Sequence, residues 1–260
     1  MNKYLAAYKV FFATCLSRNA SFKAHFILVM VMDLLFYGVT FFSTTILYDH
    51  VDQIGPWKQN EFLFFIAFML TLDHAHMALV SENFWEFSSQ LRRGTLDFEL
   101  LKPINPLFTV FFRQIRPETL MISFVPWSAL IYFGYQINLE WSAWLLLPFL
   151  LIFALVLQVS LEILYSMLMF VTVESFALNF LRMELQKLSR WPLFIYQGLF
   201  RKLFLFVIPV LVIGSGPVTF LLDYKNFELM IWGAIVLVAC WFAIGITWRR
   251  GLRRYESASS

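Results

Sequence analysis

Long apolar runs separated by short polar stretches dominate the pattern along this chain. They lack the alternation of apolar and polar positions that marks a half-buried strand, so they predict helices. A helix needs about 20 apolar residues to cross a bilayer. The pattern predicts an all-α integral membrane protein, one domain over residues 1–260. We expect six transmembrane helices, at about 24–48, 61–81, 117–135, 142–172, 202–222 and 228–248.

Composition supports this class of protein. Hydrophobic residues make up 60% of the chain and charged residues 14%, compared with roughly 25% charged residues in ordinary soluble domains. A water-soluble fold of this length could not bury so much apolar surface. The two cysteines, Cys15 and Cys240, lie far apart and predict neither a disulfide framework nor a metal site.

Lysine and arginine indicate the orientation, because cytoplasmic loops of membrane proteins carry an excess of both. Of the 20 Lys and Arg residues, all but Lys58 and Lys225 fall in four segments. These are the N-terminal segment, the stretch between predicted spans two and three, the stretch between spans four and five, and the C-terminal tail. We therefore predict that both termini are cytoplasmic. The predicted cytoplasmic loop between spans four and five contains Arg182, Lys187 and Arg190.

Apolar residues recur at helical spacing near the N-terminus, at Tyr4, Tyr8 and Phe11, and the basic residues lie off this stripe. The pattern predicts an amphipathic helix over residues 1–20 that lies in the membrane interface. A simple extension of the first span is the alternative. A break at residues 19–21, before Phe22, favours the interfacial helix.

The stretch between spans two and three, residues 82–116, carries its own helix signals. Its centre reads GTLDFELLKPINPLF. Gly94 follows two arginines, as is typical of a helix C-terminus. Thr95 is a candidate N-cap of a short helix that Pro103 ends, and Asn105-Pro106 is expected to start another. The segment is therefore predicted to be helical at the cytoplasmic surface.

Two interpretations of this segment remain open. It is either a long surface loop stabilised by its own caps, or a docking element for a cytoplasmic partner. The second is favoured, because a connection between two spans needs only a few residues. In that case Leu96, Leu100 and Leu101 share an apolar face and the charges contact the partner. The candidate coupling residues are Arg92, Arg93, Gly94, Asp97, Glu99, Lys102 and Pro103.

The stretch LRRGTLDFELLKPINPLF resembles a motif of the six-span bacterial permeases of the type-2 ABC exporter family. In that family Gly-Thr-Leu-Asp precedes Leu-Leu-(Arg/Lys)-Pro-Ile-Asn-Pro after the second span. The ending WRRGLRRYESASS and the region FVIPVLVIGSGPVTFLL are similar to the same family. The sequence departs from the pattern at Lys102, where arginine is common, and at Gly216, where a bulkier residue often precedes the proline.

This resemblance implies the membrane subunit of an ABC exporter in the bacterial cytoplasmic (inner) membrane. Two permease chains, identical or paired with a sister, would dock on a dimer of cytoplasmic ABC ATPase subunits. The interfacial helix and residues 94–103 would form the coupling surface. ATP and magnesium would bind the ATPase, so no cofactor is expected on this chain. Membrane lipid is a further expected partner, and nucleic acid is not.

The sequence contains no G-x-x-x-x-G-K-[ST] loop, so no nucleotide site of that kind is expected on this chain. It also lacks H-E-x-x-H and G-x-S-x-G patterns. We therefore predict a permease subunit without catalytic residues and without a metal site.

Ionisable side chains within spans are costly and mark functional candidates. Each of the three candidates here could instead be a hydrogen-bonded packing residue. Glycine and proline near the end of span five could break that helix into a gate, and a plain helix end at the proline is the alternative. The candidate translocation residues are Asp33, Asp73 and Glu162. The candidate outer gate consists of Gly214, Gly216 and Pro217.

Two other functions remain open. A stand-alone ion- or proton-coupled transporter would use Asp33, Asp73 and Glu162 as a relay, but it predicts inverted repeats, which are not evident. An intramembrane enzyme would need a nucleophile and base, or a metal pair, and Asp73 with His76 is a weak candidate.

Overall fold

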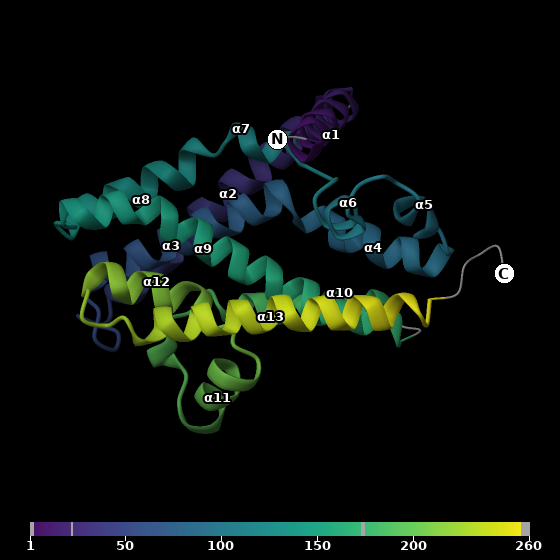
Figure 1. Ribbon diagram of the computed structural model, residues 1–260. Coiled ribbons are helices and arrows are strands. Elements are labelled where there is room, and N and C mark those ends of the chain that lie inside the picture. The colour runs from purple at the N-terminus through teal and green to yellow at the C-terminus, as the bar shows by residue number, and fades with distance from the viewer. Residues whose placement is uncertain (1–2, 22, 173–174, 256–260) are drawn as a thin grey trace.

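The computed structural model describes residues 3–21, 23–172 and 175–255. Within these ranges the chain is helical, with one isolated bridge between Ile54 and Trp57 in place of any strand. Phe22 and the tail 256–260 of the family-like ending lie outside the described residues. Figure 1 shows the arrangement. The helices are α1 (Lys3–Ala20), α2 (Lys23–Tyr48), α3 (Gln59–Leu79), α4 (Ser81–Arg93), α5 (Asp97–Leu100), α6 (Pro106–Phe111), α7 (Pro117–Met121), α8 (Phe124–Gln136), α9 (Trp141–Ser166), η1 (Met167–Phe170), α10 (Ser175–Leu188), η2 (Leu193–Ile195), α11 (Gly198–Lys202), η3 (Leu203–Val207), α12 (Val212–Leu222) and α13 (Glu228–Leu252).

Four of the predicted spans correspond to helices that are long and apolar enough to cross a membrane. They are α2, α3, α9 continued by η1, and α13. Their bounds lie close to the predicted ranges 24–48, 61–81, 142–172 and 228–248. The protein is therefore an integral membrane protein of helical class.

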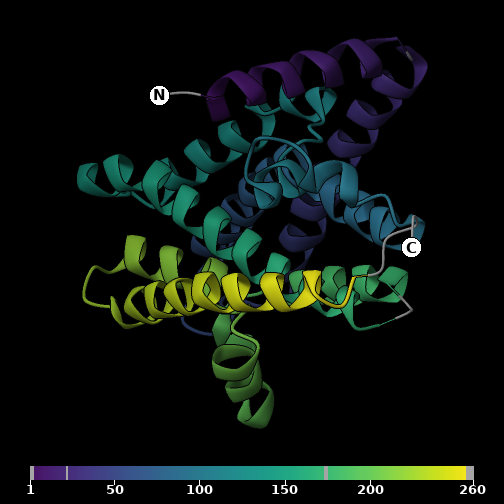
Figure 2. The same cartoon turned by 45° about the vertical axis from the view of Figure 1, so that its right-hand side comes forward.

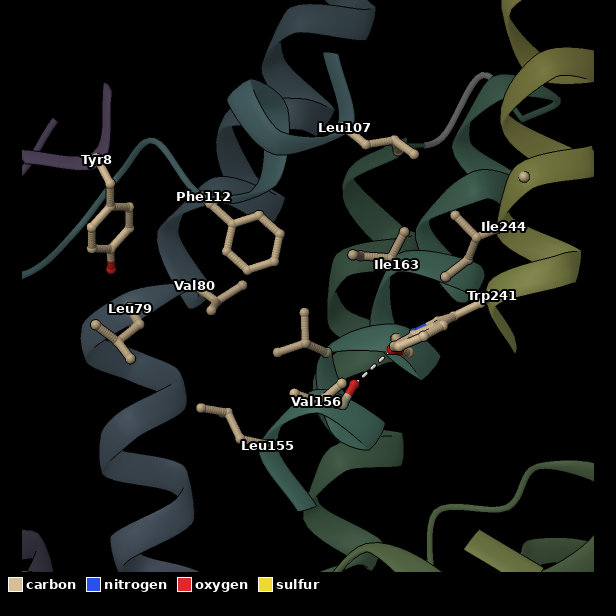
Figure 3. Close-up of a pocket in the computed structure, with 13 residues that line it drawn as sticks. Tyr8, Leu79, Val80, Leu107, Phe112, Leu155, Val156, Ile163, Trp241 and Ile244 are labelled. Carbon is tan, nitrogen blue, oxygen red and sulfur yellow. Dashed lines mark hydrogen bonds between the residues drawn. The ribbon is translucent and has the colours of Figure 1, made fainter. Parts of the chain in front are cut away.

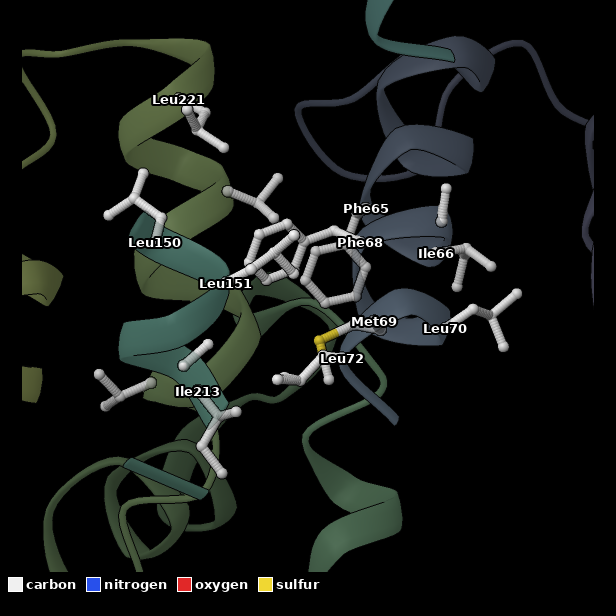
Figure 4. Close-up of a cluster of buried hydrophobic side chains, with 14 of the residues drawn as sticks. Phe65, Ile66, Phe68, Met69, Leu70, Leu72, Leu150, Leu151, Ile213 and Leu221 are labelled. Carbon is white, nitrogen blue, oxygen red and sulfur yellow. The ribbon is translucent and has the colours of Figure 1, made fainter. Parts of the chain in front are cut away.

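Helix α3 forms the centre of the bundle. Its most apolar stretch is 83% buried, whereas that of α2 is only 6% buried. A helix that is apolar on every side is typically buried. In Figure 4, Phe65, Phe68 and Met69 of α3 face Leu151 of α9 and Ile213 of α12 across the core. The outlying α2 presents most of its apolar surface to its surroundings.

The predicted span 117–135 is interrupted. α7 and α8 are separated by Ile122 and Ser123, so neither helix alone reaches spanning length. Pro126 lies in the first turn of α8 and lacks an N–H group for the helix. Polar side chains of α3 form hydrogen-bond contacts with groups near this interruption. His74 Nε2 lies 2.9 Å from Ser123 Oγ, and Thr71 Oγ1 donates to the Pro126 carbonyl at 3.2 Å.

The predicted span 202–222 is not a straight helix. Residues Gly198–Val207 and Val212–Leu222 form two parts bent by 97°. The break surrounds Pro209, whose ring and missing N–H interrupt helical hydrogen bonding. Pro217 lies inside α12, which continues to Leu222. The expected alternative of a helix end at Pro217 is therefore wrong.

Helix α10 packs along α3, in the segment that the sequence assigned to a loop between spans four and five. Residues 189–192 connect it to η2, and the contacts of this whole segment progress from one end of α3 to the other. Residues 175–195 thus cover the same depth as α3, and Arg182, Lys187 and Arg190 lie within that depth. The contacts are Asn179 with the Phe84 carbonyl, Gln186 with Asp73, Trp191 with Phe62 and Phe194 with Trp57.

The connecting segments gather at two ends of the bundle (Figure 1). At the first, the loop end, the Ser142 and Tyr224 hydroxyls lie 2.9 Å apart and the Trp57 and Phe194 rings pack at 4.9 Å. At the second, the coupling end, the Tyr255 hydroxyl accepts a hydrogen bond from the Leu96 N–H.

Helix α1 lies transverse to the long helices. It is seen nearly along its axis in Figure 1, where α13 lies across the view, and it runs across the top of Figure 2. It contacts α2 and α7. Arg18 donates to Gln114 at 3.0 Å, and Asn19 donates to Glu118 at 2.9 Å. A transverse helix fits the predicted interfacial helix better than an extension of the first span.

Candidate coupling surface and translocation site

The coupling segment, residues 94–116, begins where α4 ends. Gly94 has a φ of +65°, and its N–H contacts the carbonyls of Gln90 and Leu91. Glycine adopts this left-handed conformation without the steric cost of a Cβ atom, so the predicted helix stop is confirmed.

The sequence predicted two helix N-caps in this segment, Thr95 and Asn105, and only Asn105 is confirmed. Asn105 caps α6, because its Oδ1 atom accepts from the Leu107 N–H at 2.9 Å and Pro106 occupies the first turn. Thr95 does not cap α5, because Leu96 precedes that helix and no side-chain cap bond is present there. The single turn of α5 is instead held by side chains elsewhere in the segment.

Glu99 supplies that support. Its side chain is only 3% exposed, and its two oxygens accept from Lys102 Nζ at 2.6 Å and Arg113 Nη1 at 2.7 Å. A buried carboxylate is costly unless it is paired and hydrogen-bonded. Glu99 therefore joins α5 to the end of the segment, with its carboxylate turned inward.

The outward surface of α5 is apolar. Phe98 is 69% exposed and Leu101 81% exposed, whereas Leu96 is fully buried. The predicted common face of Leu96, Leu100 and Leu101 is wrong, because Leu96 is fully buried whereas Leu101, directly after α5, is 81% exposed. Phe98, which lies between two acidic residues, was not among the predicted site residues. Only its position in a short surface helix could have indicated it.

The predicted coupling charges lie at different depths around this surface. Arg92 and Arg93 are exposed at the end of α4, Pro103 is exposed, and Gly94, Asp97 and Lys102 are half-buried. The coupling segment is also fixed to both chain ends. Lys3 Nζ approaches the Pro103 carbonyl at 3.5 Å, and the Leu96 N–H donates to the Tyr255 hydroxyl at 3.1 Å. Burial raises the pKa of that hydroxyl, and the carboxylate of Asp97 raises it further.

A buried ion-pair network joins α3, α9 and α10. Arg182 Nη1 of α10 lies 2.5 Å from Glu162 Oε2 of α9, and their side chains are 1% and 4% exposed. His76 Nε2 of α3 contacts the same carboxylate oxygen at 2.9 Å. The guanidinium lies 4.3 Å from the Phe84 ring centroid of α4, in cation–π range. Through these contacts Glu162 of α9 links α9 to α3 and α10.

A second pair extends the network towards the loop end. Arg190 Nε lies 2.6 Å from Asp73 Oδ2, although the two atoms are not aligned as a hydrogen bond. Gln186 Nε2 donates to Asp73 Oδ1 at 3.1 Å and lies 3.5 Å from His76 Nδ1. The structure thus brings Asp73 and Glu162 into one connected network.

Asp33 is separate from this network. It lies on α2 and is partly buried, and its charged neighbours are Arg116 and Glu118 near the start of α7. The three predicted translocation residues therefore occupy two places in the molecule.

A lateral groove of about 360 Å³ runs between α2, α3 and α10. Its floor is apolar, and polar side chains enter it from all three helices. Those polar residues are Thr40, Ser43 and Thr44 of α2, Asp73 of α3, Lys187 of α10, and Arg190 just after α10.

Charged side chains are exposed on this side of α10. The side chains of Glu184 and Lys187 are 63% and 52% exposed and lie 2.5 Å apart as an ion pair. Along the chain Glu184 lies between Arg182 and Gln186, and Lys187 follows Gln186. Exposed charges such as these are unfavourable in contact with hydrocarbon.

A second hollow, on another side of the bundle, is apolar. It measures about 560 Å³ and is bounded by α1, α3, α9 and α13. Figure 3 shows Tyr8, Leu79, Phe112, Ile163 and Ile244 around it. Its lining differs from that of the lateral groove, because no charged side chain contributes to it.

The predicted gate residues are packed inside the protein. Gly214, Gly216 and Pro217 all lie within α12 and are buried. A Cβ atom on Gly214 would collide with Met69 of α3, and one on Gly216 would reach the Leu229 carbonyl at 3.5 Å. Gly214 therefore allows α12 to approach α3 closely, whereas a Cβ atom on Gly216 would make an ordinary contact with α13. Among the described residues, no group of His, Cys, Asp and Glu could hold a metal ion.

The long apolar helices define an integral membrane protein of helical class, with a lateral groove that polar side chains line. A family model described as "ABC-2 family transporter protein" matches residues 34–259. The chain belongs to this family and is a membrane component of an ABC transporter. Comparisons with curated proteins and with solved structures found no match.

Proposed function

We propose that this chain is the membrane subunit of an ATP-driven exporter in a bacterial inner membrane, with both termini cytoplasmic. A second permease chain completes the pathway, and ATP and magnesium bind a separate ATPase dimer. The six crossings are α2, α3, α7–α8, α9, α10 with η2, and α13. The bent α11–α12 pair enters from the loop end and returns to it. An even number of crossings supports termini on the same side.

The exposed apolar tip of α5 is the observation that carries the coupling proposal. Phe98 and Leu101 are mostly exposed although nearby Leu96 and Glu99 are buried. Buried aromatic and aliphatic anchors carry much of the binding energy of protein interfaces. Arg92 and Arg93 lie at the rim, where charge steers association. We infer that Phe98 and Leu101 insert into the ATPase.

Helix α10 connects this surface to the lateral groove. Asn179 donates to the Phe84 carbonyl of α4, and Arg182 stacks on the Phe84 ring. Further along the chain, Lys187 near the end of α10 and Arg190 just after it line the groove. A displacement of α4 by the ATPase would therefore reach α10 through direct contacts. Packed helices that shift in this way are a common means of switching between two states.

The lateral groove is the proposed half-pathway. Its exposed Glu184–Lys187 pair and the hydroxyls of α2 are unsuited to lipid, and a second permease chain would enclose them. Asp73 then lies at the wall of the pathway. Glu162, which is fully paired behind it, holds α10 in place.

The test of coupling is a double variant, Phe98→Ala with Leu101→Ala. Both side chains are exposed, so the fold should be retained. We expect capture of the neighbouring ATPase subunit to fall by roughly a hundredfold, which corresponds to two interface anchors. The matched control is Leu199→Ala with Phe200→Ala on α11, where the side chains are 77% and 65% exposed. Equal capture by both double variants would contradict the docking assignment.

A stand-alone proton-coupled transporter is the second candidate. The chain of contacts from Asp73 through Gln186 and His76 to Glu162 favours it. However, each carboxylate is already paired with an arginine, so protonation would break an ion pair. Uptake driven by a pH gradient in liposomes without ATPase would support this candidate over the exporter.

A further inference from the structure

A groove of about 560 Å³ lies at the coupling end between η1 and the last turns of α13. We call it the inner groove. Its apolar wall runs from Leu164 through Leu168 to Val171, and its other wall is the end of α13. Leu168 and Val171 are 52% and 63% exposed, so the groove opens to the side of the bundle.

Three arginines of one helix end border this groove. Arg250, Arg253 and Arg254 all line it and are exposed. None of them forms an ion pair with a residue that the structure describes, whereas Arg182 and Arg190 in the bundle are both paired. Helix carbonyls at a C-terminus favour cations in general. The additional feature here is that the three unpaired charges surround an apolar hollow.

The groove lies at the depth where a membrane lipid has its head and upper chain. Helix α13 is apolar as far as Trp248, and the arginines follow directly. Leu164 and Leu168 belong to the candidate span Trp141–Phe170, so the apolar wall continues into the bilayer. Basic pockets between transmembrane helices on the cytoplasmic side bind anionic lipid head groups.

We propose that the inner groove binds an anionic phospholipid. The phosphate lies among Arg250, Arg253 and Arg254, and one acyl chain lies along Leu168 towards Leu164. The choice of the cytoplasmic leaflet rests on the orientation in the proposed function. The binding itself depends on neither the ATPase partner nor transport.

An acidic surface of the ATPase is the competing occupant of these charges. The apolar wall favours lipid, because a cytoplasmic protein would contact the arginines without filling the hollow beside Leu164. Both parts of the groove therefore need to be tested, the charged mouth and the apolar wall.

The test measures phospholipid binding to the purified chain in detergent, without ATPase. The probes are phosphatidylglycerol and phosphatidylcholine, detected by native mass spectrometry. The charge variant combines Arg250→Gln, Arg253→Gln and Arg254→Gln. The matched control combines Arg92→Gln, Arg93→Gln and Arg249→Gln, which removes the same charge from exposed arginines outside the groove. A third variant, Leu168→Gln, changes the apolar wall alone.

We expect the wild type and the control to retain phosphatidylglycerol in preference to phosphatidylcholine. The charge variant should bind phosphatidylglycerol roughly a hundredfold more weakly, since each basic residue contributes about a factor of five near an anionic lipid. Leu168→Gln should weaken both lipids. Equal phosphatidylglycerol binding by the charge variant and its control would overturn the proposal. If that variant instead lost only ATPase capture, the arginines would belong to the protein interface.

Discussion

The coupling segment and helix α10 both carry charged residues between apolar helices, and the chain uses those charges in opposite ways. The coupling segment buries one carboxylate, Glu99, against two partly exposed cations and presents apolar side chains outward. Helix α10 buries Arg182 against Glu162 and leaves the Glu184–Lys187 pair exposed at the depth of α3. The number of charged residues in a segment therefore does not by itself show whether their side chains are buried or exposed. A charged side chain in these two regions is buried where an oppositely charged side chain pairs with it inside the protein.

The largest expected effect is in the α10 network. Glu162→Ala leaves the buried Arg182 without its counter-charge, and breaking a buried pair in this way costs about 3–5 kcal/mol of folding free energy. Replacing both partners, Glu162→Ala with Arg182→Met, should recover most of this loss, because neither member of the pair is left as an uncompensated buried charge. Unfolding of the detergent-solubilised protein, followed by tryptophan fluorescence, measures both. A double variant as unstable as the single would contradict the pairing.

The corresponding change in the coupling segment should have a smaller effect. Glu99→Gln removes the charge that Lys102 and Arg113 share, but those side chains are 34% and 45% exposed and can turn to water. We expect a loss of about 1.5–2 kcal/mol, at the low end of the range for hydrogen bonds to charged groups. The same unfolding measurement checks it. A loss equal to that of Glu162→Ala would remove the distinction between the two regions.

The smallest expected effect is that of a substitution at Gly94, which tests only the end of helix α4. Gly94→Ala places a Cβ atom at a φ of +65°, which costs about 1 kcal/mol. Gly245→Ala on α13 is the control, because nothing lies within 4 Å of its Cβ position and its φ is not positive. The control should be neutral or slightly stabilising in a helix. If both variants had the same stability, Gly94 would not require its left-handed conformation.

The sequence predicted the parts of the fold that depend on local chemistry. Apolar runs predicted α2, α3, α9 and α13, and the signals at Gly94 and Asn105 predicted a helix end and a helix start. The interruptions at Ile122 and around Pro209 were less evident, since hydropathy averages over short breaks. Proline marks each region but does not reveal whether a helix bends or ends.

The position of α10 could not be obtained from hydropathy. Its three charged residues, Arg182, Glu184 and Lys187, lower its apolar character, and two of them are basic, as is typical of cytoplasmic loops. The residues that contact it lie on other helices. Asp73 is 113 positions from its partner Gln186, and Glu162 is 20 positions from its partner Arg182. The exposure of Phe98 could not be predicted from local sequence for a similar reason. Its neighbour Glu99 is turned inward by an ion pair with Arg113, which lies in another part of the coupling segment.

The most direct test of the account is the side of the membrane on which residue 195 lies. In a variant without Cys15 and Cys240, Ile195→Cys is treated in intact cells with a membrane-impermeant maleimide. Ile195 is 41% exposed and follows α10 at the loop end, where Asp52→Cys is the positive control and Arg93→Cys the negative control. The account predicts labelling of positions 195 and 52 from outside and none of position 93. Labelling of position 195 only after the cells are opened would show that α10 lies in a cytoplasmic loop and would contradict the account.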